Sequence, residues 1–225
     1  MSFKILIPAR LGSKGLKNKN LRKIKKKSLV EIAIINAIKS KIVKKNDIFL
    51  SSDSEKILNI GKKFNISLLK RPKKFSNDNS TAADVINHFK LSIDFKKKIS
   101  LIYLQPSSPL ESSVHLIKAK SLYSKNKNKT TISGYIEDNE KFFKAFLYRN
   151  NKAKPLINKK FINKNRQSIK HKIFIPNGAI YIFELKKSFK KINVKEINTF
   201  IMNRNDTTDI NTYKDYLNAC RQFKK

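Results

Sequence analysis

A basic, glycine-containing loop follows the first apolar run of the chain, and its residue types are those that bind phosphate groups. Gly12 and Gly15 lie in this loop, and fixed positive charge comes from Arg10, Lys14 and Lys19. Glycine lets a backbone approach a ligand closely, and the amides of such a loop form a concave anion site. The spacing fits neither the Walker A motif nor the G-x-G-x-x-G motif. The loop therefore predicts a phosphate site, with a lysine-rich surface turn as the alternative.

The elements that must position this loop are short apolar runs that alternate with helical patterns. The first run, Phe3–Ile7, is stopped by Pro8, and the next helix opens with a capping box in which Ser28 and Glu31 satisfy each other's amides. Further strands are expected at 47–50, 66–69 and 99–104, and further helices at 54–64 and 82–93. Strands that are apolar on both faces and separated by helices indicate a parallel sheet with helices on either side. We predict a Rossmann-like α/β fold with the loop at the carboxyl end of the first strand, where such sheets bind ligands.

The pattern changes after about residue 130. Two strands are expected at 130–136 and 142–148 with no long helix between them, and a polar stretch rich in lysine and asparagine follows. Regular elements return as strands at 179–183 and 199–202 and as a final helix at 212–221. We therefore predict one domain over residues 1–225, interrupted by a strand-rich excursion at 137–175 whose exposed edges invite pairing with a second copy.

The net charge of the chain raises the question of a polyanion partner. Lysine and arginine number 51 against 16 aspartates and glutamates, which gives a formal charge of +35. Of these basic residues 44 are lysine and only 7 are arginine, and lysine, asparagine and isoleucine, all abundant here, have A/T-rich codons. A base bias of the genome explains the charge at least as well as a nucleic-acid partner does, so nucleic-acid binding is not expected.

Two other classes of protein are excluded by the composition. A single cysteine, Cys220, permits neither a disulfide framework nor a thiolate metal cluster. No run approaches 18 apolar residues, and the chain opens into a strand instead of a signal sequence. We expect a soluble, cytoplasmic protein without a membrane partner.

Six segments follow one another along nearly the whole chain in the order of a known family. The first is the loop, with its Ala9-Arg10, Ser13-Lys14-Gly15 and Lys19-Asn20-Leu21 stretches. The others are Ser51–Ser54, Arg71-Pro72 with Asp78 and Ser80-Thr81, Leu104–Leu110, Arg166-Gln167 with Pro176–Ile182, and Asp209–Thr212 with Asp215. In these motifs and their order the chain resembles the CMP-sialic acid synthetases, the acylneuraminate cytidylyltransferase family.

The resemblance implies an enzyme that joins CTP to a nine-carbon 2-keto sugar acid, giving CMP-sugar and pyrophosphate. The acid is sialic acid or a legionaminic or pseudaminic relative. Implied nucleotide-binding residues are Arg10, Gly12, Ser13, Lys14, Lys19, Asn20, Arg71 and Ser80, with Arg10, Lys14 and Lys19 on the triphosphate. Implied sugar-binding residues are Gln105, Arg166 and Tyr181, and implied Mg²⁺ ligands are Asp209 and Asn211. Arg10, Lys14, Lys19 and Asp209 are the expected catalytic residues, and the 137–175 excursion is the expected arm of a homodimer.

Three departures from the family pattern bear on the substrate. Glu111 stands where an arginine is usual, which places negative charge near an anionic substrate unless Glu111 caps the helix that follows. No aromatic pair of the kind used on the acyl group lies around Ile192-Asn193, and Asn211 replaces the second aspartate of the metal motif. Two alternatives stay open, a CMP-Kdo synthetase-like enzyme for an eight-carbon acid and a non-catalytic polyanion-binding protein on the same fold.

Overall fold

The computed structural model describes residues 2–95, 98–126, 129–137 and 140–223. Within these ranges seven strands form one sheet, in the order β11-β7-β10-β6-β1-β4-β5. Their bounds are β1 (Phe3–Pro8), β4 (Ile48–Ser52), β5 (Ser67–Lys70), β6 (Lys98–Leu104), β7 (Thr131–Glu137), β10 (Ile173–Lys186) and β11 (Asn198–Ile201). β1 pairs in parallel with β4 and β6, β4 with β5, and β7 with β11, whereas β10 is antiparallel to β6. The mostly parallel α/β sheet predicted from the sequence is confirmed.

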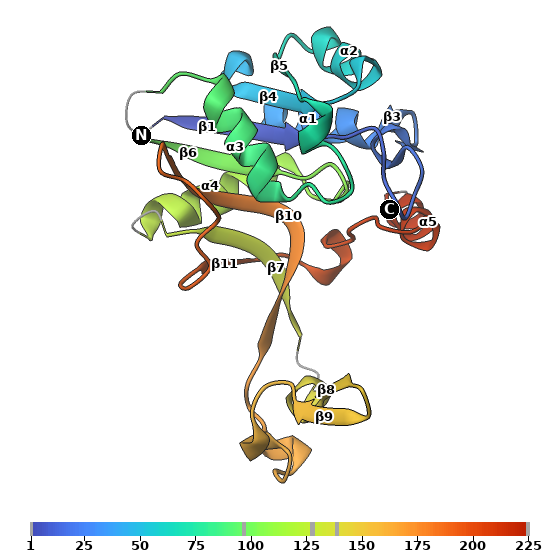
Figure 1. Cartoon of the computed structure of the whole chain (residues 1–225), viewed down its shortest axis with the longest axis vertical. Coiled ribbons are helices and arrows are strands. Elements are labelled where there is room, and N and C mark those ends of the chain that lie inside the picture. Colours follow the sequence, from blue (N-terminus) through green and yellow to red (C-terminus); the bar gives the residue numbers. More distant parts are fainter. Residues whose placement is uncertain (1, 96–97, 127–128, 138–139, 224–225) are drawn as a thin grey trace. The chain divides into compact units, whose positions relative to one another are not determined.

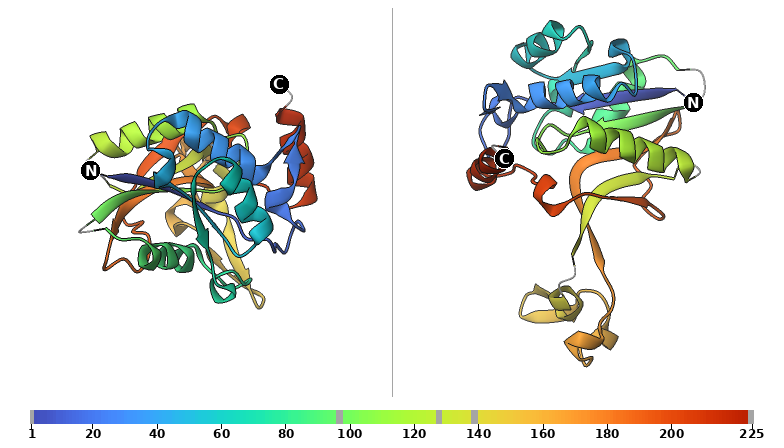
Figure 2. Two further views of the ribbon diagram at one scale, coloured as in Figure 1. Left: turned by 90° about the horizontal axis from the view of Figure 1, so that it is seen from above. Right: turned by 180° about the vertical axis from the view of Figure 1, so that it is seen from behind.

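Helices cover both faces of this sheet, as the views from front and back show (Figures 1 and 2). One face carries α1 (Leu29–Ser40), α2 (Glu55–Lys63) and α4 (Ser113–Lys125), and the other carries α3 (Ala82–Ser92). Side chains alternate along β1, so Ile5 and Ile7 pack beneath α1 and α4 while Leu6 packs beneath α3. The capping box predicted for the first helix is present, since Ser28 accepts from the Glu31 amide and Glu31 accepts from the Ser28 amide.

The C-terminal helix α5 (Tyr213–Gln222) packs beside the loop that follows β1. Leu16 and Ile24 share a buried cluster with Ile210 and Ala219, next to the small antiparallel pair β2 (Lys23–Ile24) and β3 (Lys27–Ser28). This packing fixes the last segment of the chain beside the basic loop, although about 190 residues separate them in the sequence. None of the helices in the described ranges has the length and apolar character needed to span a bilayer.

The chain divides into two compact units, residues 1–135 with 176–225 and residues 136–175. The second unit contains the antiparallel hairpin β8 (Phe146–Arg149) and β9 (Lys152–Pro155). Asn150 and Asn151 join these strands with φ of 48° and 59°, the left-handed pair that a two-residue hairpin turn favours. The rings of Phe143, Phe161 and His171 pack together as a small core.

Two elements differ from the sequence-based expectation. The predicted strand at 142–148 is a 3-10 turn at Glu140–Lys144 followed by β8, which starts only at Phe146. Helix α4, of which the sequence indicated only the start, carries exposed Val114 and Ile117 as well as buried Leu116 and Tyr123. Because apolar residues lie on both of its faces, its sequence lacks a clear amphipathic stripe.

Candidate active site

A cavity of about 280 Å³ opens at the carboxyl ends of β1 and β6. Pro8 ends β1 there and Pro106 follows β6, so both strands deliver their next residues to the cavity wall. Seven predicted site residues line it: Arg10, Ser13, Lys19, Asn20, Arg71, Ser80 and Gln105. The carboxyl end of a parallel sheet is where open α/β folds bind ligands, and the sequence motifs meet at this edge.

Backbone and side-chain bonds hold the basic loop against the neighbouring strand. The Ala9 amide donates to the Ser51 carbonyl at 2.9 Å, and the Leu11 amide donates to Oδ1 of Asp53 at 3.0 Å. Asn20 closes the loop from its far end, donating through Nδ2 to the Arg10 carbonyl at 2.9 Å. A Cβ on Gly12 would meet no atom within 4 Å, so the loop is open at that point.

Arg10 and Lys14, which the sequence assigns to the triphosphate, both contact the carboxylate of Asp78. Arg10 Nη1 donates to Asp78 Oδ1 at 2.7 Å, and Lys14 Nζ lies 3.8 Å from Asp78 Oδ2. The hydrogen bond from Arg10 lowers the pKa of Asp78, helped by the charge of Lys14. An ionised carboxylate therefore occupies the two side chains that are predicted to bind phosphate oxygens.

Lys19 joins the basic loop to the C-terminal motif. Its Nζ donates to the Ile210 carbonyl at 2.6 Å and to Oδ1 of Asn211 at 3.2 Å. Burial lowers the pKa of Lys19, and the nearby Asp209 carboxylate opposes that shift. Gly15 is needed at this junction, because a Cβ there would overlap the Asn211 carbonyl oxygen.

Asp209 lies beside this contact between Lys19 and the C-terminal motif. Its Oδ2 accepts from Asn211 Nδ2 at 2.8 Å, while its Oδ1 is buried and has no hydrogen-bond partner among the described residues. Gly178 has a left-handed φ of 75°, and a Cβ there would lie 3.9 Å from Asp209 Oδ2 and 4.0 Å from Gln105 Nε2. Asp209 also acts on Tyr181, whose pKa is raised by burial and further by this carboxylate. Asp209, Gln105 and Tyr181 are therefore neighbours, although they come from three separate motifs.

Arg71 is a buried cationic residue of the cavity wall. It is 3% exposed, and its Nε donates to Ser76 Oγ at 2.9 Å. Burial lowers the pKa of Arg71, whereas Tyr103 and Asp53 nearby favour its charged form.

The remaining predicted residues are placed less completely. Arg166 begins a 3-10 turn in the second unit, and its side chain lies outside the described residues. Asn211 has both polar atoms engaged, by Lys19 and by Asp209, so its oxygen does not face an open site. Tyr103 was not among the predicted site residues; it belongs to the buried cluster beneath α3 and also lines the cavity. Only its place two residues before Gln105, at the end of a strand, could have indicated this.

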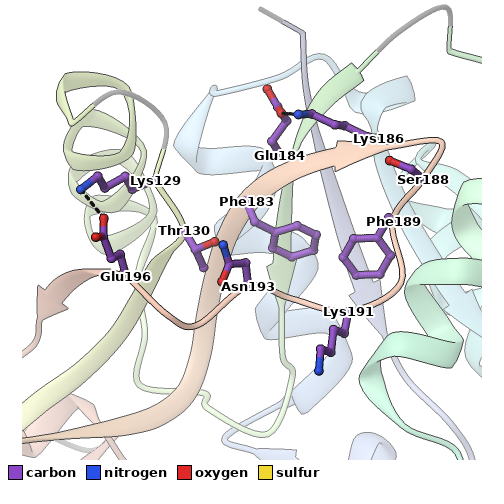
Figure 3. A pocket seen from close by; sticks show the side chains of 10 residues that line it. All are labelled: Lys129, Thr130, Phe183, Glu184, Lys186, Ser188, Phe189, Lys191, Asn193 and Glu196. Carbon is purple, nitrogen blue, oxygen red and sulfur yellow. Dashed lines mark hydrogen bonds and ion pairs between the residues drawn. The ribbon is translucent and has the colours of Figure 1, made fainter.

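A second cavity, of about 340 Å³, lies at the amino end of β6, where β10 ends (Figure 3). Four of its charged side chains are paired within the wall: Lys129 with Glu196 at 2.7 Å, and Lys186 with Glu184 at 2.8 Å. Phe183 and Phe189 stack across it, as Figure 3 shows, with ring centroids 5.5 Å apart. No predicted site residue lines this cavity, so the cavity at the carboxyl ends of β1 and β6 is the candidate active site.

Glu111 neither caps α4 nor lines the cavity, the two positions that the sequence suggested. Ser112 caps α4 in a box with His115, and Glu111 is 3% exposed between α1 and α4. Asn36 of α1 donates to the Glu111 carbonyl at 2.7 Å and to Oε1 at 3.1 Å, while Oε2 has no partner among the described residues. Burial raises the pKa of Glu111 to about 8. Glu111 is therefore a neutral acid at neutral pH and adds no negative charge to the substrate site.

This buried acid predicts a pH-dependent stability. The folded protein keeps the Glu111 proton up to a pKa of about 8, whereas the unfolded chain loses it near the ordinary value of 4.5, so stability falls as pH rises between these values. The slope from this residue is at most roughly 1.4 kcal/mol per pH unit. Glu111→Gln keeps the Asn36 bond and should remove this slope, making the variant more stable than wild type at pH 8.5. Urea unfolding from pH 5 to 9 measures this, with exposed Glu55→Gln as control; parallel curves for wild type and Glu111→Gln would refute it.

A family model described as Cytidylyltransferase matches residues 4–191, from β1 to beyond the end of β10. The chain belongs to this cytidylyltransferase family. The matched range contains the basic loop and every cavity-lining residue, so the resemblance recognised from the sequence motifs is confirmed.

Several named proteins are similar to this chain over nearly its whole length. Post-translational flagellin modification protein B of Campylobacter coli and CMP-N,N'-diacetyllegionaminic acid synthase of Campylobacter jejuni are each 31% identical over 93% of this chain and 90% of their own. N-acylneuraminate cytidylyltransferase of Streptococcus agalactiae serotype III is 29% identical over 95% of this chain. The chain spans about half, 51%, of that streptococcal relative's length.

Solved structures extend the likeness to the fold of cytidylyltransferases. CMP:2-keto-3-deoxy-manno-octonic acid synthetase complexed with CTP matches with a TM-score of 0.70 at 16% identity, covering 100% of both chains. 4-Diphosphocytidyl-2C-methyl-D-erythritol synthase from Anaerococcus prevotii matches with a TM-score of 0.64 at 11% identity, covering 100% of this chain and 96% of the other. At these identities the shared feature is the fold.

Proposed function

We propose that this cytidylyltransferase joins CMP from CTP to a nine-carbon 2-keto sugar acid of the sialic, legionaminic or pseudaminic type. The observation that carries the proposal is the single cavity in which six residues assigned to the nucleotide meet Gln105, assigned to the sugar acid. Relatives named for N-acylneuraminate and for N,N'-diacetyllegionaminic acid support this substrate class. The likeness to a CMP-Kdo synthetase is one of fold, which keeps an eight-carbon acid as the alternative.

The proposed reaction needs positioning and charge neutralisation more than covalent chemistry. The anomeric hydroxyl oxygen of the acid attacks the α-phosphorus, the bond from that phosphorus to the bridging oxygen breaks, and pyrophosphate leaves while the hydroxyl proton passes to solvent. Arg10 and Lys14 exchange the Asp78 carboxylate for phosphate oxygens, and Lys19 adds a third positive charge. We assign the sugar carboxylate to Arg166, because a guanidinium binds a carboxylate bidentately.

The residues present fit one Mg²⁺ ion. Asp209 offers a buried carboxylate oxygen without a hydrogen-bond partner, and Mg²⁺ is commonly held by one or two carboxylates together with substrate phosphates. Within the described ranges no group of three or more His, Cys, Asp or Glu side chains could hold a metal without such phosphates. We propose that Asp209 holds Mg²⁺ with the triphosphate, and that the bound ion would neutralise charge on the phosphate oxygens.

Pyrophosphate release from CTP tests the proposal directly. The purified chain is given CTP with sialic, legionaminic, pseudaminic or Kdo acid, and UTP replaces CTP in a parallel series. We expect release with CTP and at least one nine-carbon acid. Release with Kdo alone would establish the alternative, and no release with any acid would refute the proposed activity. Salt-resistant nucleic-acid binding in place of turnover would favour the polyanion-binding alternative.

The position of the Asp78 carboxylate predicts that its removal should strengthen CTP binding. Asp78 competes with the triphosphate for Arg10 and Lys14, so Asp78→Asn should lower the KM for CTP about two- to fivefold, in the range of a surface ion pair. Asp94→Asn, the same charge change at an exposed position outside the cavity, is the control. A raised KM for CTP in Asp78→Asn would mean that the carboxylate assists binding instead.

The second unit supports the proposal of a homodimer. Its hairpin and the segment after it expose Phe146, Leu147, Tyr148, Leu156 and Ile157. Exposed apolar patches of this kind mark interaction sites, and a two-fold pairing of identical copies is the default arrangement. We expect light scattering to give a dimer, and Leu147→Glu with Tyr148→Glu to give a monomer. A monomeric wild type with full activity would contradict the proposal.

The cytoplasmic location expected from the sequence stays a prediction.

A further inference from the structure

Tyr103 is a buried tyrosine that faces the active-site cavity. It lies in β6, paired with Leu6 of β1 on one side and with Tyr181 of β10 on the other. The residue is 5% exposed, yet it lines the cavity together with Arg71 and Gln105. Its neighbours Ile102 and Leu104 face the other side of the sheet and lie in the core beneath α1 and α4. Tyr103 is therefore the residue of β6 that the cavity reaches.

The Tyr103 hydroxyl makes no hydrogen bond to any residue that the structure describes. Its oxygen is not one of the buried polar atoms that lack a partner within the described residues, so it borders the cavity and is not sealed inside the core. The fully buried Tyr123, by contrast, has a partner, since Ser100 Oγ lies 3.3 Å from its hydroxyl. The Tyr103 hydroxyl is therefore available to a ligand in the cavity.

The surroundings of Tyr103 include one residue assigned to the sugar acid and one assigned to the nucleotide. The ring packs edge-on against Tyr181, with centroids 6.4 Å apart and planes at 74°. The charge of Arg71 opposes the rise in the pKa of Tyr103 that burial causes. That raised pKa keeps the hydroxyl protonated, so it can donate a hydrogen bond but cannot act as a base.

We propose that Tyr103 is a specificity-determining residue whose hydroxyl donates a hydrogen bond to an uncharged acceptor oxygen on the sugar acid, from a ring hydroxyl or an acylamino group. The assignment rests on the proposed function. The acid is favoured over CTP because the ring contacts Tyr181 and shares the cavity wall with Gln105, both on the sugar side. A site with such a donor discriminates against an acid that lacks the matching acceptor.

The test measures binding of the acid directly. Isothermal titration calorimetry measures the binding of each of the four acids to wild type, Tyr103→Phe and Tyr123→Phe. It also measures the binding of a CTP analogue in which methylene replaces the α–β bridging oxygen. For the acid that wild type binds most tightly, Tyr103→Phe should weaken affinity about fivefold to tenfold, the share of one neutral hydrogen bond. The same variant should bind the CTP analogue as wild type does and should melt at the same temperature, because the hydroxyl makes no hydrogen bond to the described residues that the fold would lose. Tyr123→Phe should keep the affinity for the acid.

Three results with Tyr103→Phe would overturn the inference. They are unchanged affinity of Tyr103→Phe for every acid, loss of affinity for the CTP analogue instead, and a melting temperature that falls together with acid affinity. Absence of acid binding by wild type would also overturn it. Failure of the proposed function is seen separately, as binding of acid and CTP by wild type without pyrophosphate release.

Discussion

Arg10→Ala is expected to lower kcat/KM for CTP by well over tenfold. Arg10 lines the cavity, and its guanidinium already holds an anionic oxygen, that of Asp78, at 2.7 Å. A fixed charge aimed at a triphosphate contributes several kcal/mol, on the order of 3, to stabilising the transition state of phosphoryl-type transfer. Steady-state pyrophosphate release at varied CTP measures the effect.

The control for this prediction is Arg22→Ala. Arg22 lies just beyond the same loop, is exposed and does not line the cavity, so its removal changes net charge equally without removing a ligand. Arg22→Ala should keep kcat/KM within about threefold, a change of less than ~1 kcal/mol. Wild-type kcat/KM in Arg10→Ala would remove the loop from the active site.

Asp209→Asn should nearly abolish activity. The substitution replaces the carboxylate that has a buried oxygen free for Mg²⁺ with a neutral amide, in a site dominated by the positive charges of Arg10 and Lys19. Because Mg²⁺ strongly prefers carboxylate and phosphate oxygens, the remaining site has no protein charge to hold it. The rate is measured across a Mg²⁺ titration, with Asp206→Asn, three residues away, as the control. Full rate in Asp209→Asn would show that the metal site is misassigned.

The companion variant Asn211→Asp tests the same site in the opposite direction. Asn211 contacts both Lys19 and Asp209, so an aspartate there would add a second carboxylate beside the first. We expect a lower Mg²⁺ concentration for half-maximal rate than in wild type. An unchanged titration would mean that residue 211 is not near the metal.

Much of the fold could be predicted because its signals are local. The apolar run of β1 and the Ser28-Glu31 capping box depend on residues that are adjacent in the chain, and both are present as predicted. The basic loop was recognisable for the same reason, since its glycines and charges lie within a dozen residues.

The features that escaped prediction depend on contacts between distant segments. Lys19 is held by the Ile210 carbonyl, which no pattern near Lys19 indicates. Glu111 is neutral because α1 and α4 enclose it, and the burial of one acid depends on how two helices pack. Tyr103 belongs to the core and also borders the cavity, and an apolar strand does not show which of its residues does both.

The most direct test of the proposed reaction is the stoichiometry of its products. CTP and the acid that supports pyrophosphate release are incubated with the enzyme, and the mixture is resolved by chromatography and mass spectrometry. Attack of the anomeric hydroxyl on the α-phosphorus predicts CMP-sugar and pyrophosphate in equal amounts, with both formed more than tenfold more slowly by Arg10→Ala under the same conditions. CDP with inorganic phosphate, or CMP without a sugar adduct, would contradict it.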